Sequence, residues 1–328
     1  MAPPPKMLIT ILGGSGFVGS ELIARLSRRG HRIRLLTRWS RAPAHLAVLP
    51  NLESRRVDVH DEAALRREFS GSDVVINLVG ILNESGFSGR GFQVAHAELA
   101  RKVVAACVAS QVPRLLHMSS FGADLNAPSF YLQSKGLAEQ HVRAAPAALA
   151  WTIFRPSVIF GAHDSLLNRF AQLLPLSRGW IPLARANTRF APVWVSDVAA
   201  AFEQALTDPS TIGRSFDLGG PETLTLKELV ELAGKLSGTP AKVIALPDFI
   251  GRLQAAMLDF VPGKPFSSDN FRSLQLDNAP TTSGLQALGI TPTSLSTIAP
   301  TYLGAAGQDQ NRYAAFRRQA GRYGTMRG

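Results

Sequence analysis

The sequence predicts an α/β protein, with a doubly wound parallel sheet, helices on both faces of the sheet and a smaller C-terminal lobe. Three observations predict this fold. An apolar run at 7–12 leads through a glycine-rich loop into a helix, short strands then alternate with helices up to residue 160, and prolines become frequent beyond Gly161. The alternation indicates a parallel sheet, because parallel neighbours need a crossover connection.

Residues 7–12 (MLITIL) form a continuous apolar run, as expected for a strand buried on both faces. Residues 20–29 follow with Leu22, Ile23 and Leu26 at helical spacing, and Gly30 stands where a C-cap glycine belongs. The same patterns predict further strands at 32–37, 54–59, 73–79, 114–118 and 151–155, and helices at 61–69, 92–110 and 131–144.

Beyond Gly161 the alternation weakens, and separate helices are expected at 196–207, 226–237 and 247–260. The apolar spacing in the last of these favours a core-facing helix over one that faces a membrane or a partner. We therefore expect a first domain over 6–160, a smaller lobe over 161–308 that returns in part to the first domain, and a basic tail over 309–328.

The composition is that of a globular protein, with 328 residues, 45% of them hydrophobic, and a formal net charge of +11. No apolar run approaches the roughly 20 residues of a membrane span. The N-terminus lacks the pattern of a secretory signal, and the single Cys107 lies in an apolar helical run, as a small core residue does. These features favour a reducing, cytoplasmic compartment.

The basic residues are spread along the chain, with two clusters at 25–41 and in the tail from 310, and they predict attraction to anions. No motif of a nucleic-acid-binding protein accompanies them, so nucleic acid is not an expected partner. The seven histidines show no metal-ligand spacing, and no metal site is expected.

The loop ILGGSGFVG satisfies two glycine spacings at once, Gly13-x-x-Gly16-x-x-Gly19 and Gly14-x-Gly16-x-x-Gly19. Its position between a strand and a helix is the context that makes this motif typical of dinucleotide binding in a Rossmann sheet. The first glycines permit a tight turn, Gly16 lets a pyrophosphate approach the backbone, and Gly19 lets the helix pack closely on the sheet. The helix N-terminus attracts the phosphates. The residues expected at the cofactor are Gly13, Gly14, Ser15, Gly16, Phe17, Val18 and Gly19.

The end of the second strand favours NADP(H) over NAD(H). An NAD site usually places an acidic residue about 20 residues after the glycines, whereas this chain has LTRWSR without an acid. Arg38, with help from Arg41, is expected to bind a 2′-phosphate through charge-assisted hydrogen bonds; the alternative is two solvated surface arginines. Asp58 and the adjacent Val59 are expected beside the adenine, unless Asp58 only caps a turn.

Tyr131 and Lys135 lie four positions apart on a predicted helix and are therefore neighbours on one face. A nearby cation favours the phenolate, so Lys135 would make Tyr131 a usable acid or base. Ser119 and Ser120 follow the predicted strand at 114–118, at the sheet edge where the reactive ring of the cofactor is expected. One of these hydroxyls could hydrogen-bond a substrate oxygen.

With these motifs the chain resembles the extended and atypical short-chain dehydrogenase/reductases. The resemblance rests on the glycine loop, Asp58, the segment NLVG at 77–80, HMSS at 117–120, Tyr131 with Lys135, and RPSVIFG at 155–161. It implies catalytic roles for Ser120, Tyr131 and Lys135, and Ser119 is the alternative to Ser120 as the catalytic serine. It also implies cofactor contacts from Leu78, Val79, Gly80, Ser119, Tyr131, Lys135, Pro156, Ser157 and Val158.

A narrower resemblance comes from the second lobe, where the chain is similar to the NADPH-holding (39-kDa-type) accessory subunit of respiratory complex I, to its bacterial epimerase/dehydratase-like homologues and to proteins associated with ubiquinone biosynthesis. The segments that carry it are 189–199, 216–221, 246–249, 260–265, 269–270 and 289–293. This resemblance implies a tightly held cofactor, a quinone-linked complex as partner, and a peripheral position on the cytoplasmic face of the inner membrane. The arginine-rich tail is either a solvated end or, in a protein that docks at a membrane enzyme, a segment that contacts anionic lipid or an acidic partner.

Two functions therefore stay open. One is a nucleotide-holding protein that supports the assembly or stability of a membrane complex, and the other is an active NADP-dependent reductase, epimerase or dehydratase that uses Ser120, Tyr131 and Lys135. A nucleotide-sensing regulator is disfavoured by the presence of Tyr131 and Lys135. No motif in the sequence indicates a particular substrate or oligomeric state.

Overall fold

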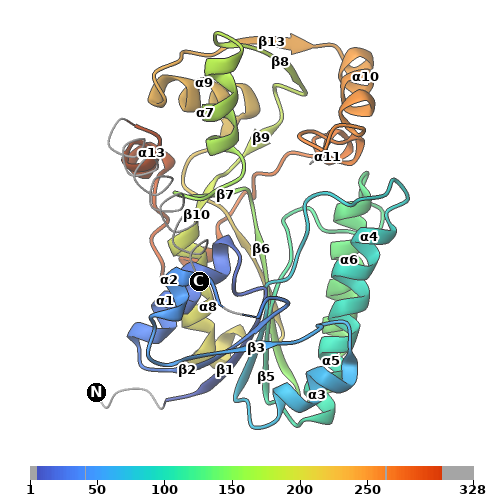
Figure 1. Ribbon diagram of the computed structural model, residues 1–328, viewed down its shortest axis with the longest axis vertical. Coiled ribbons are helices and arrows are strands. Elements are labelled where there is room, and N and C mark those ends of the chain that lie inside the picture. Colours follow the sequence, from blue (N-terminus) through green and yellow to red (C-terminus); the bar gives the residue numbers. More distant parts are fainter. Residues whose placement is uncertain (1–5, 41, 263, 305–328) are drawn as a thin grey trace, which may run out of the picture.

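The computed structural model describes residues 6–40, 42–262 and 264–304 (Figure 1). Two expectations from the sequence lie outside these residues, namely the role of Arg41 and the basic tail at 309–328. Within the described residues, no helix combines the length and the apolar character that crossing a membrane requires.

A seven-stranded parallel sheet forms the centre, in the order β11-β6-β5-β4-β1-β2-β3. The strand order reverses at β1, whose neighbours are β2 and β4, and ligands of such sheets bind at this reversal. The doubly wound fold is thereby confirmed. The strands are β1 (Leu8–Leu12), β2 (Arg32–Thr37), β3 (Leu52–Arg56), β4 (Val74–Asn77), β5 (Arg114–Met118), β6 (Ala150–Pro156) and β11 (Arg214–Leu218).

Helices cover both faces of this sheet because its inner strands are apolar on both sides. On β4, Val74 and Ile76 join the core under one set of helices, and Val75 joins the core under the other. The first set consists of α1 (Phe17–Arg28), α2 (Ala44–Ala47) and α8 (Val195–Thr207). The second consists of α3 (Glu62–Phe69), α4 (Arg90–Phe92), the π-helical segment η1 (Gln93–Glu98), α5 (Leu99–Ala109) and α6 (Phe130–Arg143). Cys107 is fully buried in this second core, as expected.

The second lobe returns to the sheet through α8 and β11. Helix α8 packs against α1, and β11 pairs with β6 in parallel as an outer strand. Such a return was expected, but the segment 214–218 (RSFDL) was not predicted as a strand, because its apolar pattern is weak: only Phe216 and Leu218 are buried there. A short 3₁₀ turn, η2 (Pro209–Thr211), connects the two elements.

The rest of the second lobe has its own core, in which Leu229 and Val230 of α9 meet Leu167 of α7 and Leu295 of α13. Its strand pairs are β8 (Trp180–Ala184) with β13 (Lys242–Leu246), β7 (Ile159–Phe160) with β10 (Val193–Trp194), and β9 (Arg189–Phe190) with β12 (Leu224–Thr225). Its helices are α7 (Leu167–Leu176), α9 (Leu226–Leu236), α10 (Asp248–Leu258), α11 (Ser268–Ser273), α12 (Gly284–Ala287) and α13 (Leu295–Leu303).

The expectation that the helix at 247–260 faces the core is wrong. Of the residues of α10, only Gly251 and Ala255 are buried. A side chain at Gly251 would lie within 2.9 Å of Ala184 and Phe271, so the helix packs closely through its small residues and turns its large apolar residues outward. An apolar stripe shows that a helix is amphipathic, but not which side the rest of the chain covers.

Most other elements differ from expectation by a few residues at their ends, and two differ more. The third strand ends at Arg56 instead of Val59, because β3 is an exposed edge strand and the valines that suggested it follow in the next turn. The long helix expected at 92–110 is divided into α4, η1 and α5. The π-helical η1 places His96 inside the protein, and π-helical turns often occur at functional sites.

Buried His96 connects the loop after β4 to α6 through a directional chain of hydrogen bonds. The Ile81 amide donates to Nε2 of His96 at 3.0 Å, which leaves Nδ1–H to donate to the Ser134 hydroxyl at 2.8 Å. Ser134 donates in turn to the Tyr131 carbonyl at 2.7 Å. The chain requires a neutral imidazole, since a proton on Nε2 would face the Ile81 N–H.

Burial, together with the Lys135 ammonium, lowers the pKa of His96 to about 2 and that of His117 to about 3. Below pH 6.5 the unfolded chain therefore binds two protons that the folded protein excludes, and stability falls as the pH falls. We expect these two histidines to remove about 4 kcal/mol from the free energy of unfolding between pH 8 and pH 5. Urea unfolding at several pH values measures this loss.

In the variant His117→Gln, the fall in the free energy of unfolding between pH 8 and pH 5 should be smaller by about half of these 4 kcal/mol. His163→Gln, which replaces an exposed histidine, should leave the fall unchanged. A profile that His117→Gln leaves unchanged would show that His117 is not excluded from protonation in the folded protein.

Candidate nucleotide-binding and active site

The glycine loop brings β1, β4 and α1 into closer contact than side chains would permit. A Cβ on Gly13, which has φ +74°, would lie 2.8 Å from the Leu78 carbonyl carbon and the Val79 nitrogen. A Cβ on Gly19 would lie 2.4 Å from the Gly14 Cα. Gly16 differs from Gly13 and Gly19, since it is exposed and a Cβ on it would meet only the Gly13 oxygen, at 3.3 Å. Gly16 is thus the position at which a ligand can approach the backbone.

The N-terminus of α1 is free to receive an anion. Gly16 is its N-cap and provides no side-chain hydrogen bond, and the first turn contains no acidic residue. The amide groups and the positive end of the helix dipole therefore point at this position without an internal counter-ion. Ser15 and Phe17 flank it, while the Val18 side chain is buried in the core, so that only its backbone is available. The loop fits the phosphates of a dinucleotide.

Arg38 follows β2 as an exposed residue, and its guanidinium lies 5.2 Å from the ring centroid of exposed Trp39. Asp58 is exposed in the turn after β3, where one carboxylate oxygen accepts from the His60 amide at 2.9 Å. Asp58 thus caps a turn, and its second oxygen has no hydrogen bond within the described residues. Val59 beside it is partly buried against the core.

Ser120, Tyr131 and Lys135 come together at the carboxyl end of β5. The Ser120 hydroxyl, which donates to the Phe121 carbonyl at 3.3 Å, lies beside the Tyr131 phenol, and the Lys135 ammonium donates to the Met118 carbonyl at 3.2 Å. Lys135 passes directly behind Gly80, where a Cβ would lie 3.2 Å from its Nζ. A side chain larger than glycine at position 80 would therefore displace the ammonium.

Burial raises the pKa of Tyr131, and the hydrogen bond from Ser120 opposes this shift. Burial lowers the pKa of Lys135 to about 8, against the opposing charge of Glu139. Near neutrality Tyr131 therefore carries its proton and Lys135 is mostly charged, which is the state that can give a proton to a substrate oxygen.

The other residues implied by the resemblance differ in what they offer a ligand. The Ser119 hydroxyl is buried and has no partner within the described residues, so a bound ligand or water would satisfy it. The Ser157 hydroxyl donates to the Asn278 carbonyl at 2.6 Å, and the Val158 amide donates to the Asn278 side chain at 3.1 Å. The polar groups of Ser157 and Val158 are thus engaged with the second lobe, and Pro156 has no amide hydrogen to offer.

Sequence reasoning missed the role of Asp269 on α11. Its carboxylate accepts from the Phe130 amide at 2.7 Å and from the Tyr131 amide at 3.0 Å, at the first turn of α6. The second lobe thereby holds the helix that carries Tyr131 and Lys135. The only local signal in the sequence was Ser129, which accepts from the Leu132 amide as N-cap; a carboxylate more than one hundred residues away left no pattern.

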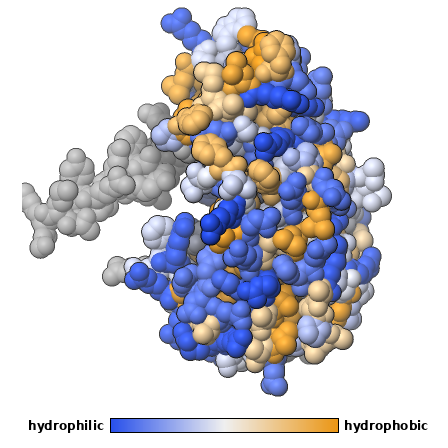
Figure 2. All heavy atoms as spheres, turned by 90° about the vertical axis from the view of Figure 1, so that its right-hand side faces the viewer, coloured by the Kyte–Doolittle hydropathy of each residue, from blue (hydrophilic) through white to orange (hydrophobic). Residues whose placement is uncertain are grey.

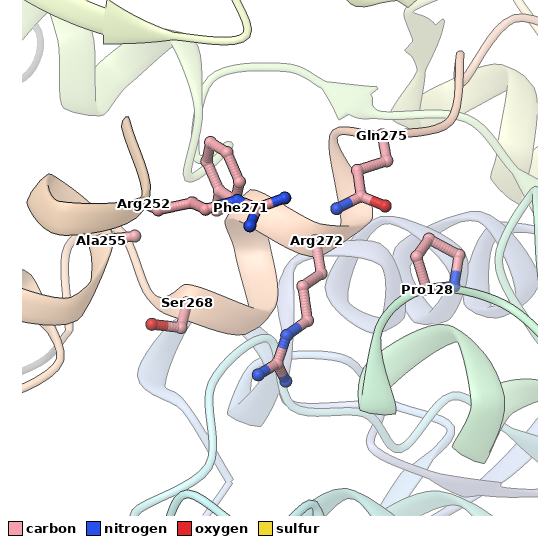
Figure 3. A pocket seen from close by; sticks show the side chains of 7 residues that line it. All are labelled: Pro128, Arg252, Ala255, Ser268, Phe271, Arg272 and Gln275. Atoms are coloured by element: carbon pink, nitrogen blue, oxygen red, sulfur yellow. The ribbon is translucent and has the colours of Figure 1, made fainter. Parts of the chain in front are cut away.

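Two pockets flank α11 where the lobes meet. One of about 220 Å³ lies beside Phe92, Phe130 and Asp269, next to the N-terminus of α6. The other, of about 530 Å³, lies between α10 and Pro128 (Figure 3). Arg252 extends over it from α10, whereas Arg272 points away from Arg252 towards the first domain. None of the site residues expected from the sequence lines this second pocket.

Comparison with known proteins agrees with this geometry. A family model described as NAD(P)H-binding matches residues 13–168. The mitochondrial NADH dehydrogenase [ubiquinone] 1 alpha subcomplex subunit 9 of Arabidopsis thaliana is 33% identical over 293 residues, which are 85% of this chain and 71% of the relative. The ceramide reductase of Caulobacter vibrioides is 30% identical over 251 residues, 76% of each chain.

Among solved structures, that of gox2253 matches with a TM-score of 0.73 and 20% identity, over 93% of this chain and 99% of the other. This likeness confirms the fold. The identity to the plant subunit over both lobes shows more than the fold. The chain belongs to the family of complex I alpha subcomplex subunit 9, and its first domain matches an NAD(P)H-binding family model.

Proposed function

We propose that this protein holds NADP(H) tightly and supports a quinone-linked membrane complex, with respiratory complex I as the first candidate and a ubiquinone-biosynthesis assembly as the second. The observation that carries this proposal is the extent of the match to the Arabidopsis subunit, which spans 85% of the chain and therefore includes the second lobe. The glycine loop alone would account for similarity in the first domain only.

Hydrogen bonds between the lobes support retention of a nucleotide. The Asn83 side chain donates to the Lys264 carbonyl at 3.1 Å, and the Lys264 ammonium donates to the Gly86 carbonyl at 2.6 Å. The Asn270 side chain donates to the Leu82 carbonyl at 3.4 Å. The loop after β4 is thus hydrogen-bonded to the second lobe beside the proposed cofactor site. These hydrogen bonds have to break if the nucleotide leaves the site on that side.

Co-migration with the complex tests the supporting role. Native electrophoresis of membranes from the source cell should show the protein together with the NADH-oxidising, quinone-reducing complex, and deleting the protein should lower the amount of assembled complex. Tyr131→Phe should restore the complex as well as the wild type does, because this role needs no proton transfer. A protein that leaves washed membranes entirely and co-purifies with no respiratory or quinone-synthesis protein would contradict the proposal.

Arg38 is the basis for proposing NADP(H). Arg38→Ala should weaken NADPH binding by about 1.5–3 kcal/mol, the scale of a hydrogen bond to a charged group, and leave NADH binding unchanged. Arg32→Ala is the matched control, because Arg32 is exposed at the opposite end of the same strand. Titration of nucleotide-free protein with both nucleotides measures the effect, and equal affinity of the wild type for NADPH and NADH would contradict this assignment.

A second candidate function, carbonyl reduction, is favoured by the arrangement of Ser120, Tyr131 and Lys135. When bound, NADPH supplies a hydride. Tyr131 would give its proton to the substrate oxygen, Ser120 would hydrogen-bond that oxygen, and the Lys135 ammonium would stabilise the phenolate that remains. In an epimerase or dehydratase the Tyr131 side chain would act in the opposite direction, as a phenolate that takes a proton from the substrate. The Caulobacter relative, which is 30% identical to this chain, is named a ceramide reductase, and this similarity supports the second candidate.

The variant Tyr131→Phe separates the two candidates. If the protein is a reductase, ketone-dependent oxidation of NADPH should fall by about 10²–10⁴-fold, the usual contribution of a general acid, while NADPH affinity stays the same. The nicotinamide absorbance measures the first quantity in a panel of long-chain ketones, and direct titration measures the second. Wild-type turnover in the variant would exclude Tyr131 as the acid.

A further inference from the structure

Helix α10 presents a continuous apolar stripe to solvent. Phe249, Leu253, Met257 and the adjoining Phe260 are 72%, 61%, 65% and 81% exposed. Their spacing of four, four and three residues places them on one side of the helix. Figure 2 shows apolar side chains gathered on the upper part of the face that includes this region.

The chain itself fixes this orientation. Gly251 and Ala255 are the buried residues of α10, and the space beyond Gly251 is filled by Ala184 and Phe271, so the helix cannot turn its phenylalanines inward without losing this contact. Val261, in the turn after α10, adds to this apolar character, and Trp180, Ile244 and Leu176 are further exposed apolar side chains of the same lobe. An apolar surface of this extent marks a binding surface in a soluble protein.

Several cations of this lobe, among them Arg252 on α10 itself, have no carboxylate partner within the described residues. Within the described residues, no carboxylate lies within ion-pair distance of Arg178, Lys242, Arg252 or Lys264. Lys242 instead lies 5.1 Å from the Trp180 ring centroid.

Asp248 pairs with Arg185 at 2.6 Å, and Asp259 accepts from the Ser268 amide at 3.2 Å. The surface therefore combines exposed aromatic and aliphatic groups with cations that no carboxylate pairs, and this combination suits an anionic bilayer surface.

We propose that the α10 surface, formed by Phe249, Leu253, Met257 and Phe260 with Arg252 on the same helix and Lys242 at the start of β13, docks on an anionic phospholipid membrane. The apolar stripe enters the boundary between headgroups and acyl chains, and the cations meet the lipid phosphates. Positive charge without compensating carboxylates disfavours a second copy of this chain, which would bring like charges together. The inference goes beyond nucleotide holding and does not depend on it.

Co-sedimentation with lipid vesicles tests the proposal on the full chain loaded with NADPH. The wild type should bind phosphatidylcholine vesicles that contain phosphatidylglycerol at least about tenfold more tightly than pure phosphatidylcholine vesicles. Phe249→Ser/Leu253→Ser/Phe260→Ser should weaken this binding at least about tenfold. Arg252→Gln/Lys242→Gln should weaken it about fivefold per charge and reduce its dependence on salt.

Val48→Ser/Val108→Ser replaces exposed valines of the first domain and should bind vesicles as the wild type does. NADPH affinity and the melting temperature should be the same in all variants, which separates this test from that of nucleotide holding. A wild type that binds neither vesicle, or a triple serine variant that binds as tightly as the wild type, would overturn the proposal. So would a wild-type dimer that the triple variant converts to monomers, since a second copy would then cover the surface.

Discussion

The site depends on the contact between the start of α1 and the end of β1. Gly19 packs against the backbone of Gly14, and Gly13 packs against the backbone of Leu78 and Val79, which follow β4. In both places the backbones lie too close for a methyl group to fit between them. These contacts hold the N-terminus of α1 over the reversal in strand order, with Gly16 left open and no acid nearby. The electrostatic attraction for phosphate follows from this placement, because the helix dipole acts only within about its first turn.

The second lobe is coupled to the same place by side chains from its loops and helices. Asp269 caps α6, Asn278 holds the segment after β6, and Asn270 binds the loop after β4. Three edges of the candidate site are therefore fixed by one lobe, so movement of that lobe would alter Tyr131, the nicotinamide end and the loop together. A protein that retains its nucleotide and a reductase that closes over its substrate would both use such coupling.

Features that depend on a few neighbouring residues could be predicted from the sequence. The strands at 32–37 and 114–118 have the expected bounds, and Tyr131 and Lys135 share a face of α6 because helical spacing alone determines it. Features that depend on distant contacts could not be predicted. The cap from Asp269 and the pairing of β11 join segments far apart in the chain, and the outward face of α10 is decided by Gly251 against Ala184.

The identity and the exchange rate of the nucleotide in the purified protein test the central claim most directly. Nucleotide released by denaturing the freshly purified protein would be identified by mass spectrometry, and exchange would be followed with an excess of isotopically labelled NADPH. The account predicts close to one NADP(H) per chain, which labelled NADPH replaces slowly. Protein that carries NAD(H), or that carries no nucleotide and exchanges added NADPH rapidly, would contradict it.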